Sequence, residues 1–380
     1  MLSLLKWLRQ REASMARLLG KFVRAESPSM DKASVDRFGR MVAEEWRRRG
    51  AKVSILRQQE RGDHLRVEWN PRGNRAKGQI LVLGHLDTVY EIGTLARMPF
   101  RVSRGRAYGP GAFDMKGGLL LALFAVDALN AAGVAPEKPV VLLWTSDEEI
   151  GSGTSRAAIE REARRSDAVL VLEPALGTDG RVKTGRKGVG EIEIVATGRA
   201  AHAGLNPLDG INAIEEIALQ IARISRWNQP REEITVSAGV IEGGTRTNVI
   251  PERARVVVDV RATRASDMRA LEQKFRALRP ILLGAKLQIR SGFNRPPMER
   301  KYCAALFSKA RALANGMGVT LGQAHVGGGS DGNFTAAMGV PTLDGLGAVG
   351  EGAHSSHENV IIGALPERAA LIAGLLSTIR

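Results

Sequence analysis

The sequence of 380 residues predicts an α/β protein with a smaller α+β domain inserted into it. Between residues 80 and 172, short Val-, Ile- and Leu-rich runs alternate with longer helical patterns, which is typical of buried parallel strands separated by helices. From Val189 apolar and polar residues alternate instead, and the expected order of elements is β, α, β, β, α, β, the ferredoxin-like order. After Pro296 and Pro297 the α/β pattern resumes.

These changes of pattern place the domain boundaries. We expect an α/β domain made of residues 1–186 and 298–380, interrupted by an inserted domain at residues 187–297. In the α/β domain the sequence predicts strands at residues 79–84, 138–146 and 168–174, and helices at residues 117–133, 154–163, 301–314 and 364–379. In the inserted domain it predicts strands at residues 191–198, 234–244, 254–262 and 285–291, and helices at residues 211–227 and 266–278.

Composition argues against several classes of protein. The chain carries 55 Lys and Arg against 40 Asp and Glu, a formal charge of +15, but the basic residues are spread along it and aromatic residues make up only 4%. We therefore expect a solvated basic surface, with no nucleic acid as a partner. The first 12 residues predict an amphipathic helix and not a signal peptide, and the longest apolar run, residues 117–126, is too short to span a membrane. With Cys303 as the single cysteine, we expect a cytoplasmic protein in which any metal is held by His and carboxylates.

Two candidate groups lie near the first predicted strand. His85 and Asp87 emerge where this strand ends, and open α/β sheets have their functional sites at the carboxyl ends of strands. A His beside a carboxylate suits a metal ligand, although a pair that caps a loop explains this motif equally well. Asp114 follows a Gly-rich turn and precedes a long apolar helix, where a helix N-cap is the simpler explanation.

Three further candidate groups complete the set. Glu148 and Glu149 follow the second predicted strand directly after Asp147, and such adjacent carboxylates need a counter-charge, which a metal or solvating water can supply. Glu173 follows the third strand, and His354 lies in a Gly-rich loop before the last helix. Together these groups predict a bimetallic hydrolase, because carboxylates with a few imidazoles suit Zn²⁺, and also Co²⁺ or Mn²⁺, in pairs about 3.5–4 Å apart.

Five ordered motifs resemble those of a known family, the zinc-dependent amidohydrolases and exopeptidases of metallopeptidase family M20. They are G-H-x-D-T-V at residues 84–89, G-x-x-D-M-K-G-G at residues 111–118, the D-E-E run, the later E-P, and A-H-S-x-x-E at residues 353–358. The segments GGGSDGNFTAAMGVPTLDGLG and RPPMER are most similar to the glutamate carboxypeptidase branch. The resemblance implies a zinc-exopeptidase-type catalytic domain and an inserted domain that serves as a lid and dimerises.

The resemblance also implies a ligand set with two Zn²⁺ per subunit. Asp114 would bridge the two ions, with His85 and Glu173 completing one site and Glu149 and His354 the other. His357 is the alternative metal ligand to His354, but it occupies a variable position of the motif.

Further residues in the same domain would support the chemistry. Glu148 would be the general base, and Asp87 would orient His85. His64 and His325 match no catalytic position, so a structural or surface role is expected for both.

For the inserted domain the resemblance implies a second set of residues. His202 would reach the active site of a dimer partner and stabilise the tetrahedral oxyanion. The residues of this domain that would bind the substrate are Asn248, Arg261 and Arg295. In the α/β domain, Gly328 and Gly329 are further candidates, because their backbone N–H groups could bind the substrate beside the site. Without the resemblance, an ordinary turn is enough to explain Asn248, Gly328 and Gly329. Single arginines such as Arg261 and Arg295 are weak evidence for a binding site in so Arg-rich a chain.

The predicted activity is cleavage of an amide or peptide bond next to a free carboxylate, by water. We expect release of C-terminal glutamate from small acidic peptides, N-acyl-glutamates or folate-like substrates. The main alternative is an N-acyl-amino-acid deacylase of the acetylornithine deacetylase, succinyl-diaminopimelate desuccinylase or aminoacylase type. A remote alternative, from another class, is a non-catalytic basic binding protein. Covalent catalysis is not expected, because no G-x-S-x-G motif occurs and Cys303 lies in an apolar helical stripe.

Overall fold

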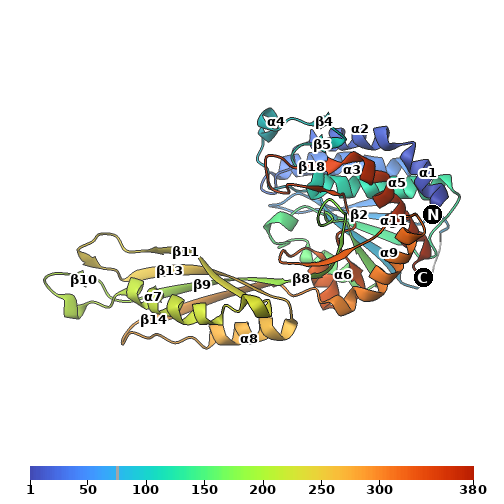
Figure 1. Cartoon of the computed structure of the whole chain (residues 1–380). Coiled ribbons are helices and arrows are strands. Elements are labelled where there is room, and N and C mark those ends of the chain that lie inside the picture. The colour runs from blue at the N-terminus through green and yellow to red at the C-terminus, as the bar shows by residue number, and fades with distance from the viewer. Residues whose placement is uncertain (74–76) are drawn as a thin grey trace. The chain divides into compact units, whose positions relative to one another are not determined.

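The structure, a computed structural model, describes residues 1–73 and 77–380. These residues divide into two units (Figure 1). Unit 1 comprises Met1–Gly185, Glu299–His325 and Ser330–Arg380, and unit 2 comprises Arg186–Met298 and Val326–Gly329. Among the described residues, no helix has the length and apolar character needed to cross a membrane.

Unit 1 is built on a six-stranded sheet with the strand order β1-β2-β6-β3-β7-β16. The three strands predicted here are present as β3 (Gln79–His85), β6 (Val140–Thr145) and β7 (Ser166–Val171), and β3 pairs in parallel with both of the others. Their carboxyl ends therefore lie at one edge of the sheet. The α/β fold class is confirmed.

An antiparallel hairpin that the sequence analysis missed extends this sheet. It consists of β1 (Lys52–Leu56) and β2 (His64–Trp69), and β2 pairs antiparallel with β6, Leu65 lying opposite Trp144. Because the two strands run in opposite directions, the first residue of β2, His64, lies beside the carboxyl end of β6. This placement becomes important for the site described below.

Helices cover both faces of the sheet (Figure 1). In β3, Ile80 and Val82 pack in a cluster with the helices of one layer, and Leu81 and Leu83 pack with the other layer. Both layers bury apolar side chains, which explains why these strands are apolar throughout rather than alternating. The first layer consists of α1 (Leu2–Arg9), α2 (Glu12–Val23), α3 (Lys32–Arg48), α5 (Gly117–Ala131), α9 (Ala304–Asn315) and α11 (Leu365–Thr378), and the second of α6 (Arg156–Ala163) and α10 (Gly332–Ala337).

The remaining elements of unit 1 are short. They include a four-stranded sheet in the order β17-β18-β5-β4 and a two-stranded pair of β15 and β8. Their bounds are β4 (Arg101–Ser103), β5 (Arg106–Tyr108), β8 (Val182–Arg186), β15 (Gln323–Val326), β16 (Thr342–Leu343), β17 (Gly350–Glu351), β18 (Asn359–Ile361) and α4 (Thr94–Arg97). The last residue of β8 and the last residue of β15 belong to unit 2.

Unit 2 has its own core, formed between one face of a four-stranded sheet and two helices. The strand order is β11-β13-β9-β14, and the elements follow one another along the chain as β9, α7, β11, β13, α8 and β14. Their bounds are β9 (Gly188–Thr197), α7 (Ala213–Ile224), β11 (Thr235–Gly243), β13 (Arg253–Ala262), α8 (Ala265–Arg276) and β14 (Lys286–Arg295), with β10 (Ala201–His202) and β12 (Val249–Ile250) forming a separate pair. A role for this unit as a lid or a dimerisation domain stays a prediction.

The unit boundaries differ from the predicted ones by one residue at each end of the inserted domain, where Arg186 and Met298 lie in unit 2, and at one further segment. Val326–Gly329 belongs to unit 2, whereas the sequence analysis assigned it to the catalytic domain. The backbone amide of Lys187 donates to Val326 O at 3.0 Å, and Arg261 Nη1 donates to Gly327 O at 2.9 Å. These contacts join segments far apart in sequence, so the sequence pattern gave no signal for them.

Candidate metal centre

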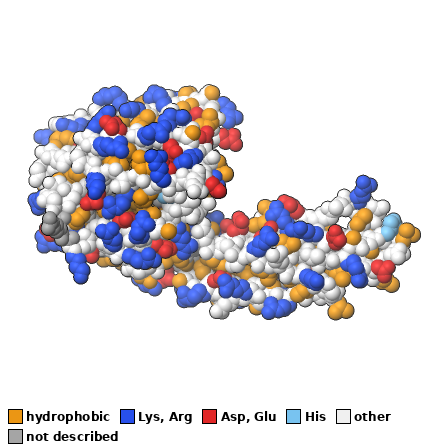
Figure 2. Space-filling view, turned by 180° about the vertical axis from the view of Figure 1, so that it is seen from behind, with side chains coloured by type: hydrophobic (Ala, Val, Ile, Leu, Met, Phe, Trp, Pro, Cys, Tyr) orange, Lys and Arg blue, Asp and Glu red, His pale blue; other side chains and the backbone are white. Residues whose placement is uncertain are grey.

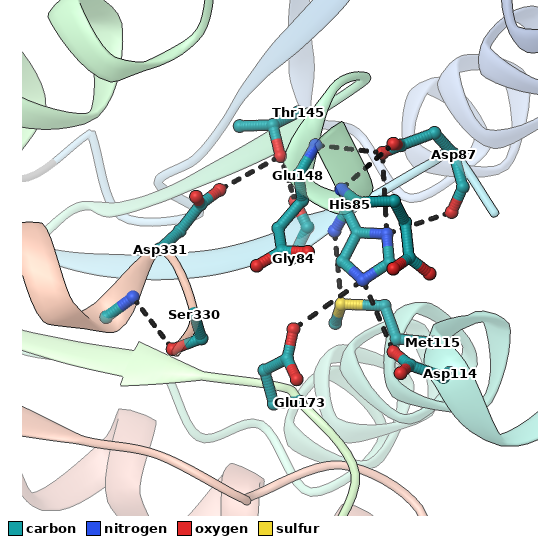
Figure 3. A network of polar contacts seen from close by, with 12 residues as sticks. Gly84, His85, Asp87, Asp114, Met115, Thr145, Glu148, Glu173, Ser330 and Asp331 are labelled. Carbon is teal, nitrogen blue, oxygen red and sulfur yellow. Dashed lines mark hydrogen bonds and ion pairs between the residues drawn. The ribbon is translucent and has the colours of Figure 1, made fainter. Parts of the chain in front are cut away.

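Most of the candidate ligands of unit 1 lie at the carboxyl ends of the parallel strands or before a helix (Figure 3), and His354 lies in the loop between β17 and β18. His85 is the last residue of β3, and Glu173 lies just beyond the end of β7. Glu148 and Glu149 lie in a 3₁₀ turn, η2 (Glu148–Ile150), which follows β6. Since these three strands are parallel, their carboxyl ends bring the side chains to one edge of the sheet, where open α/β proteins have their sites.

Asp114 lies between the two candidate histidines. His85 Nε2 is 3.3 Å from Asp114 Oδ1 and 3.5 Å from Glu173 Oε1. His354 Nε2 is 3.3 Å from Asp114 Oδ2 and 3.2 Å from Glu149 Oε2. Each oxygen of the Asp114 carboxylate therefore faces a different imidazole, and the Nε2 atom of each imidazole faces one further carboxylate.

Several polar atoms of this cluster are buried without a hydrogen-bond partner. They are His85 Nε2, Asp114 Oδ1 and Glu149 Oε1. Burying such atoms without a partner is costly, and a coordinated cation would satisfy them. Two groups have ligand atoms within 4.8 Å of one another, namely His85, Glu148 and Glu173, and His85, Asp114 and Glu149. The donor set of imidazole and carboxylate fits Zn²⁺ and similar cations.

The charges of the cluster also favour a cation. Burial raises the pKa of Glu149, and the neighbouring charge of Asp114 raises it further. Hydrogen bonds with Asp114 and Glu149 raise the pKa of His354 to about 10. Burial opposes protonation of His85, but its contacts with Asp114 and the other carboxylates raise its pKa well above the usual value. The carboxylates therefore stabilise positive charge between them.

Asp87 connects the first imidazole to the turn that carries the two glutamates (Figure 3). Its Oδ1 lies 3.4 Å from His85 Nδ1 and accepts a hydrogen bond from the Glu148 amide at 3.3 Å. Its Oδ2 accepts from the Glu149 amide at 3.2 Å and from Ser29 Oγ at 2.7 Å. Ser29 had no assigned role in the sequence analysis, since nothing in its neighbourhood marks it.

Glu358 is a second buried residue to which the sequence analysis gave no role. It accepts hydrogen bonds from the backbone amides of Gly111 at 2.9 Å, Phe113 at 2.7 Å and Asp114 at 2.8 Å. Burial raises the pKa of Glu358 to about 7. The residue therefore holds the turn that presents Asp114, in which the Asp114–Met115 peptide bond is cis. Its place at the end of the A-H-S-x-x-E motif is the signal that could have identified it.

The last His-rich loop presents one of its two histidines to the carboxylates. His354 contacts Asp114 and Glu149, whereas His357 is exposed and its Nδ1 lies 3.0 Å from Ser355 Oγ. His354 has a φ of 61°, an uncommon left-handed conformation for a residue with a side chain. Such conformations occur preferentially at functional sites.

The other two histidines in unit 1 differ in burial. His325 is exposed, and its ring lies close to Gly185. His64 is fully buried and contacts Ser146 and Thr154, which flank the two glutamates in sequence.

The predicted residues of the inserted domain all lie in unit 2. His202 is exposed at the end of β10, and its Nδ1 accepts hydrogen bonds from the amides of Gly204 and Leu205, each at 3.1 Å. Asn248 is also exposed, and its carbonyl oxygen accepts from the Ala203 amide at 2.9 Å. The loops that carry His202 and Asn248 are therefore bonded to each other.

Arginines hold the Gly-rich segment of unit 2. Arg186, which was not among the predicted residues, is buried and donates to Gly328 O at 3.1 Å and Gly329 O at 3.0 Å. Arg295 is also buried and lies against Gly329, where an added Cβ would come within 2.8 Å of its Cδ. Arg261 pairs with Asp259 at 3.0 Å. The two glycine carbonyls are thus fixed, while a role for their amides stays a prediction.

On the face shown in Figure 2, Lys and Arg side chains are scattered over both units, with Asp and Glu among them. The expectation that nucleic acid is not a partner stays a prediction.

Comparisons with known sequences show an extensive similarity. Residues 81–378 match the sequence model of Peptidase family M20/M25/M40. The chain is 32% identical over 378 residues to carboxypeptidase G2 of Pseudomonas sp. (strain RS-16), which covers 96% of this chain and 89% of the relative.

Solved structures share the fold over nearly the whole chain. Aminopeptidase PepT from Bacillus cereus ATCC 10987 matches with a TM-score of 0.80 and 21% identity, covering 96% of this chain and 98% of that one. The M20 family metallo-carboxypeptidase Sso-CP2 from Sulfolobus solfataricus matches with a TM-score of 0.74 and 18% identity over the same shares. YXEP from Bacillus subtilis, a dinuclear metal-binding peptidase, matches with a TM-score of 0.70 and 15% identity, covering 98% of each chain.

Proposed function

The chain belongs to Peptidase family M20/M25/M40 and is a metal-dependent, carboxypeptidase-type hydrolase, and we propose that it is a di-zinc exopeptidase that releases C-terminal glutamate. The predicted family and enzyme class are thereby confirmed. The metal, the substrate and the residue roles that follow belong to the proposal.

The observation that carries the di-metal assignment is the position of Asp114 between two imidazoles. Its Oδ1 and Oδ2 each lie 3.3 Å from the Nε2 atom of His85 and His354, respectively. We assign His85 and Glu173 to one Zn²⁺, Glu149 and His354 to the other, and Asp114 to both. Co²⁺ or Mn²⁺ would suit the same donors. Cations held by these residues would supply polarisation of the scissile carbonyl and a lower pKa of the attacking water.

Glu148 is the proposed general base. Its backbone amide is fixed by Asp87 Oδ1 at 3.3 Å, and a carboxylate oxygen lies within 4.8 Å of ligand atoms of His85 and Glu173. From there it takes a proton from the attacking water and returns it to the leaving amine nitrogen. Asp87 holds His85 at Nδ1 through its backbone carbonyl oxygen, at 2.9 Å, and its Oδ1, at 3.4 Å, which leaves Nε2 directed at the carboxylates.

The specificity for a carboxylate next to the scissile bond rests on unit 2. We assign Arg261 and Arg295 to the substrate carboxylate, because a guanidinium binds a carboxylate through two parallel hydrogen bonds. Asn248 and the amides of Gly328 and Gly329 would contact the rest of a small acidic peptide. The similarity to carboxypeptidase G2, 32% identity over 96% of this chain, supports this choice of substrate.

His202 is proposed to stabilise the oxyanion, in a homodimer that forms through unit 2. The exposed surface of this unit supports such an interface. Leu205 and Leu208 beside His202 are 78% and 96% exposed, and Val240 and Ile241 on the edge strand β11 are 47% and 57% exposed. Exposed apolar groups of this kind are typical of protein contacts.

A substrate profile tests the proposal against its main alternative. Purified enzyme is assayed on N-acyl-glutamates, folates and glutamate-terminated dipeptides, and in parallel on acetylornithine, succinyl-diaminopimelate and neutral N-acyl amino acids. The proposal predicts the highest kcat/KM on the first group, with a fall in kcat/KM at higher salt for acidic substrates only. No hydrolysis of any C-terminal glutamate would favour the N-acyl-amino-acid deacylase. No hydrolysis at all, without bound metal, would favour a non-catalytic binding protein.

A further inference from the structure

The two proposed catalytic carboxylates of Glu148 and Glu149 share one short segment. It connects β6 to α6 and comprises residues 146–155, with Ser146 at its start and Thr154 near its end. Within it, the Gly151 amide donates to Glu148 O at 2.9 Å, and the Ser152 amide donates to Asp147 O at 2.8 Å. These local bonds close the turn, but they do not fix it against the sheet.

His64 joins the two ends of this segment from the neighbouring strand β2. Its Nδ1 lies 2.9 Å from Ser146 Oγ, and its Nε2 lies 3.2 Å from Thr154 Oγ1. The imidazole is fully buried. One rigid ring thus spans the residues immediately before and after the loop that carries both glutamates.

Both hydroxyls that face the ring donate their own protons elsewhere. Ser146 Oγ donates to Gly62 O, and Thr154 Oγ1 donates to Asp147 Oδ2 at 2.7 Å, so each oxygen is free to accept a hydrogen bond from the ring. Burial lowers the pKa of His64, which favours the neutral ring. The contacts of both nitrogens place the ring between the two hydroxyls.

Carboxylates complete the attachment at the same ends. Asp147 Oδ2 accepts from the Thr154 amide at 2.6 Å and from Thr154 Oγ1 at 2.7 Å. Asp331 bonds to the hydroxyl of Ser152 and accepts from Thr145 Oγ1 at 3.1 Å. Among the contacts described for Ser146 and Thr154, the ring of His64 is the only imidazole.

We propose that His64 is a positioning residue, which holds Glu148 and Glu149 in place by bridging Ser146 and Thr154. This role of His64 rests on the proposed function and adds to it the residue that positions Glu148 and Glu149. The contacts described for His64 are with Ser146 and Thr154, neither of which is a proposed ligand. Outer-shell partners that fix ligand orientation affect metal affinity or activity by about 10–100-fold, and we expect an effect of this size.

Variants at His64 test its contact with Ser146 and its contact with Thr154 separately. His64→Phe removes both hydrogen bonds, His64→Asn keeps a donor near the Nδ1 position, and His64→Gln keeps a polar group near the Nε2 position. Thr154→Val and Ser146→Ala remove the partners singly. Gln79→Leu is the matched control, because Gln79 is also buried and bonds to Glu162 and Ser166 at the opposite end of β3.

Three readouts are measured on each variant: hydrogen exchange of the amides of residues 146–155 without metal, zinc stoichiometry, and steady-state kinetics. For His64→Phe we expect exchange faster by about tenfold, weaker binding of one zinc of two, and a kcat lower by about 10–100-fold with a smaller change in KM. His64→Asn and His64→Gln should recover part of each effect. Gln79→Leu should lower thermal stability alone.

The outcomes distinguish this inference from the proposed function. Unchanged exchange and zinc stoichiometry in His64→Phe would overturn the role of His64, as would the same three changes in Gln79→Leu. If His64→Phe does not fold, Thr154→Val and Ser146→Ala decide the question by the same readouts. If the wild-type protein hydrolyses none of the substrates, the proposed function fails, while hydrogen exchange still decides whether His64 orders the segment.

Discussion

The backbone amide of Asp114 donates a 2.8 Å hydrogen bond to Glu358 Oε1, across 244 residues of sequence. The same carboxylate accepts from the amides of Gly111 and Phe113. Glu358, in the C-terminal part of the chain, therefore sets the conformation of the turn that carries Asp114.

Replacing Glu358 should destabilise unit 1 and disturb metal binding. Glu358→Ala leaves three buried amides without an acceptor, and each costs about 1–3 kcal/mol. We expect a clear fall in Tm and loss of bound zinc, measured by thermal unfolding and elemental analysis. Glu358→Gln keeps an acceptor oxygen and should lose less. The control is Glu351→Ala, since Glu351 is exposed and pairs only with Arg106 among the contacts described. Equal effects of both Ala variants would contradict the assignment.

Replacing Glu148 should remove catalysis and leave the metals bound. Glu148→Gln lacks the proton acceptor, and general-base catalysis contributes about 10²–10⁴-fold. We expect kcat to fall by a factor in this range, with two zinc ions still present by elemental analysis. Full turnover in this variant would refute the base assignment, and loss of one metal would show that Glu148 is a ligand.

Replacing the ligands should change the zinc stoichiometry in different ways. Asp114→Asn weakens both sites, because each oxygen of Asp114 faces a different imidazole. Glu173→Gln weakens one site only. Isothermal titration of the apoprotein should therefore show weakening of both binding steps in the first variant and of one step in the second. Equal stoichiometries in the two variants would argue against a bridging Asp114.

Acid should destabilise the protein partly through His64. Burial lowers the pKa of His64 below its usual value of 6.5, despite the opposing charges of Asp147, Asp331 and Asp87. The unfolded chain then binds a proton at a higher pH than the folded one. The stability that His64 contributes is present above pH 6.5 and is lost as the pH falls through the lower folded pKa.

Thermal unfolding of the apoprotein over about pH 5 to 8 measures this effect. His64→Asn should show a smaller loss of Tm towards acid than the wild type. His357→Asn is the control, because His357 is exposed. Identical pH profiles of the wild type and His64→Asn would contradict the prediction.

Cys303 should react with thiol reagents only after unfolding. Its side chain is fully buried, and burial raises the pKa of the thiol to about 12. Since the thiolate is the reactive species, labelling of the native protein should be slow at neutral pH and should follow the unfolding transition in denaturant. Rapid labelling without denaturant would show that α9 opens locally.

Much of the fold was predictable from local pattern. The runs at β3, β6 and β7 are apolar along their whole length because helices bury both faces, and this pattern alone predicts parallel strands. The hairpin of β1 and β2 was not predicted. Residues Lys52–Leu56 are only partly buried, so no strong hydrophobic period marks them.

The sequence by itself determined the inventory of the site. His85, Glu149 and Glu173 follow apolar strands, and parallel strands carry the residues after them to one edge of the sheet. The motifs around Asp114 and His354 completed the set by resemblance. These are properties of short segments, which a sequence displays directly.

Only the tertiary structure decided which residues hold this inventory in place. Ser29, Glu358 and His64 are distant in sequence from the groups they contact, and each carries an ordinary local signal or none. His64 in particular was expected to have a structural or surface role, and it is buried against both ends of the glutamate segment. Hydrogen bonds between distant segments depend on how the chain packs, and a local pattern of residues does not encode their geometry.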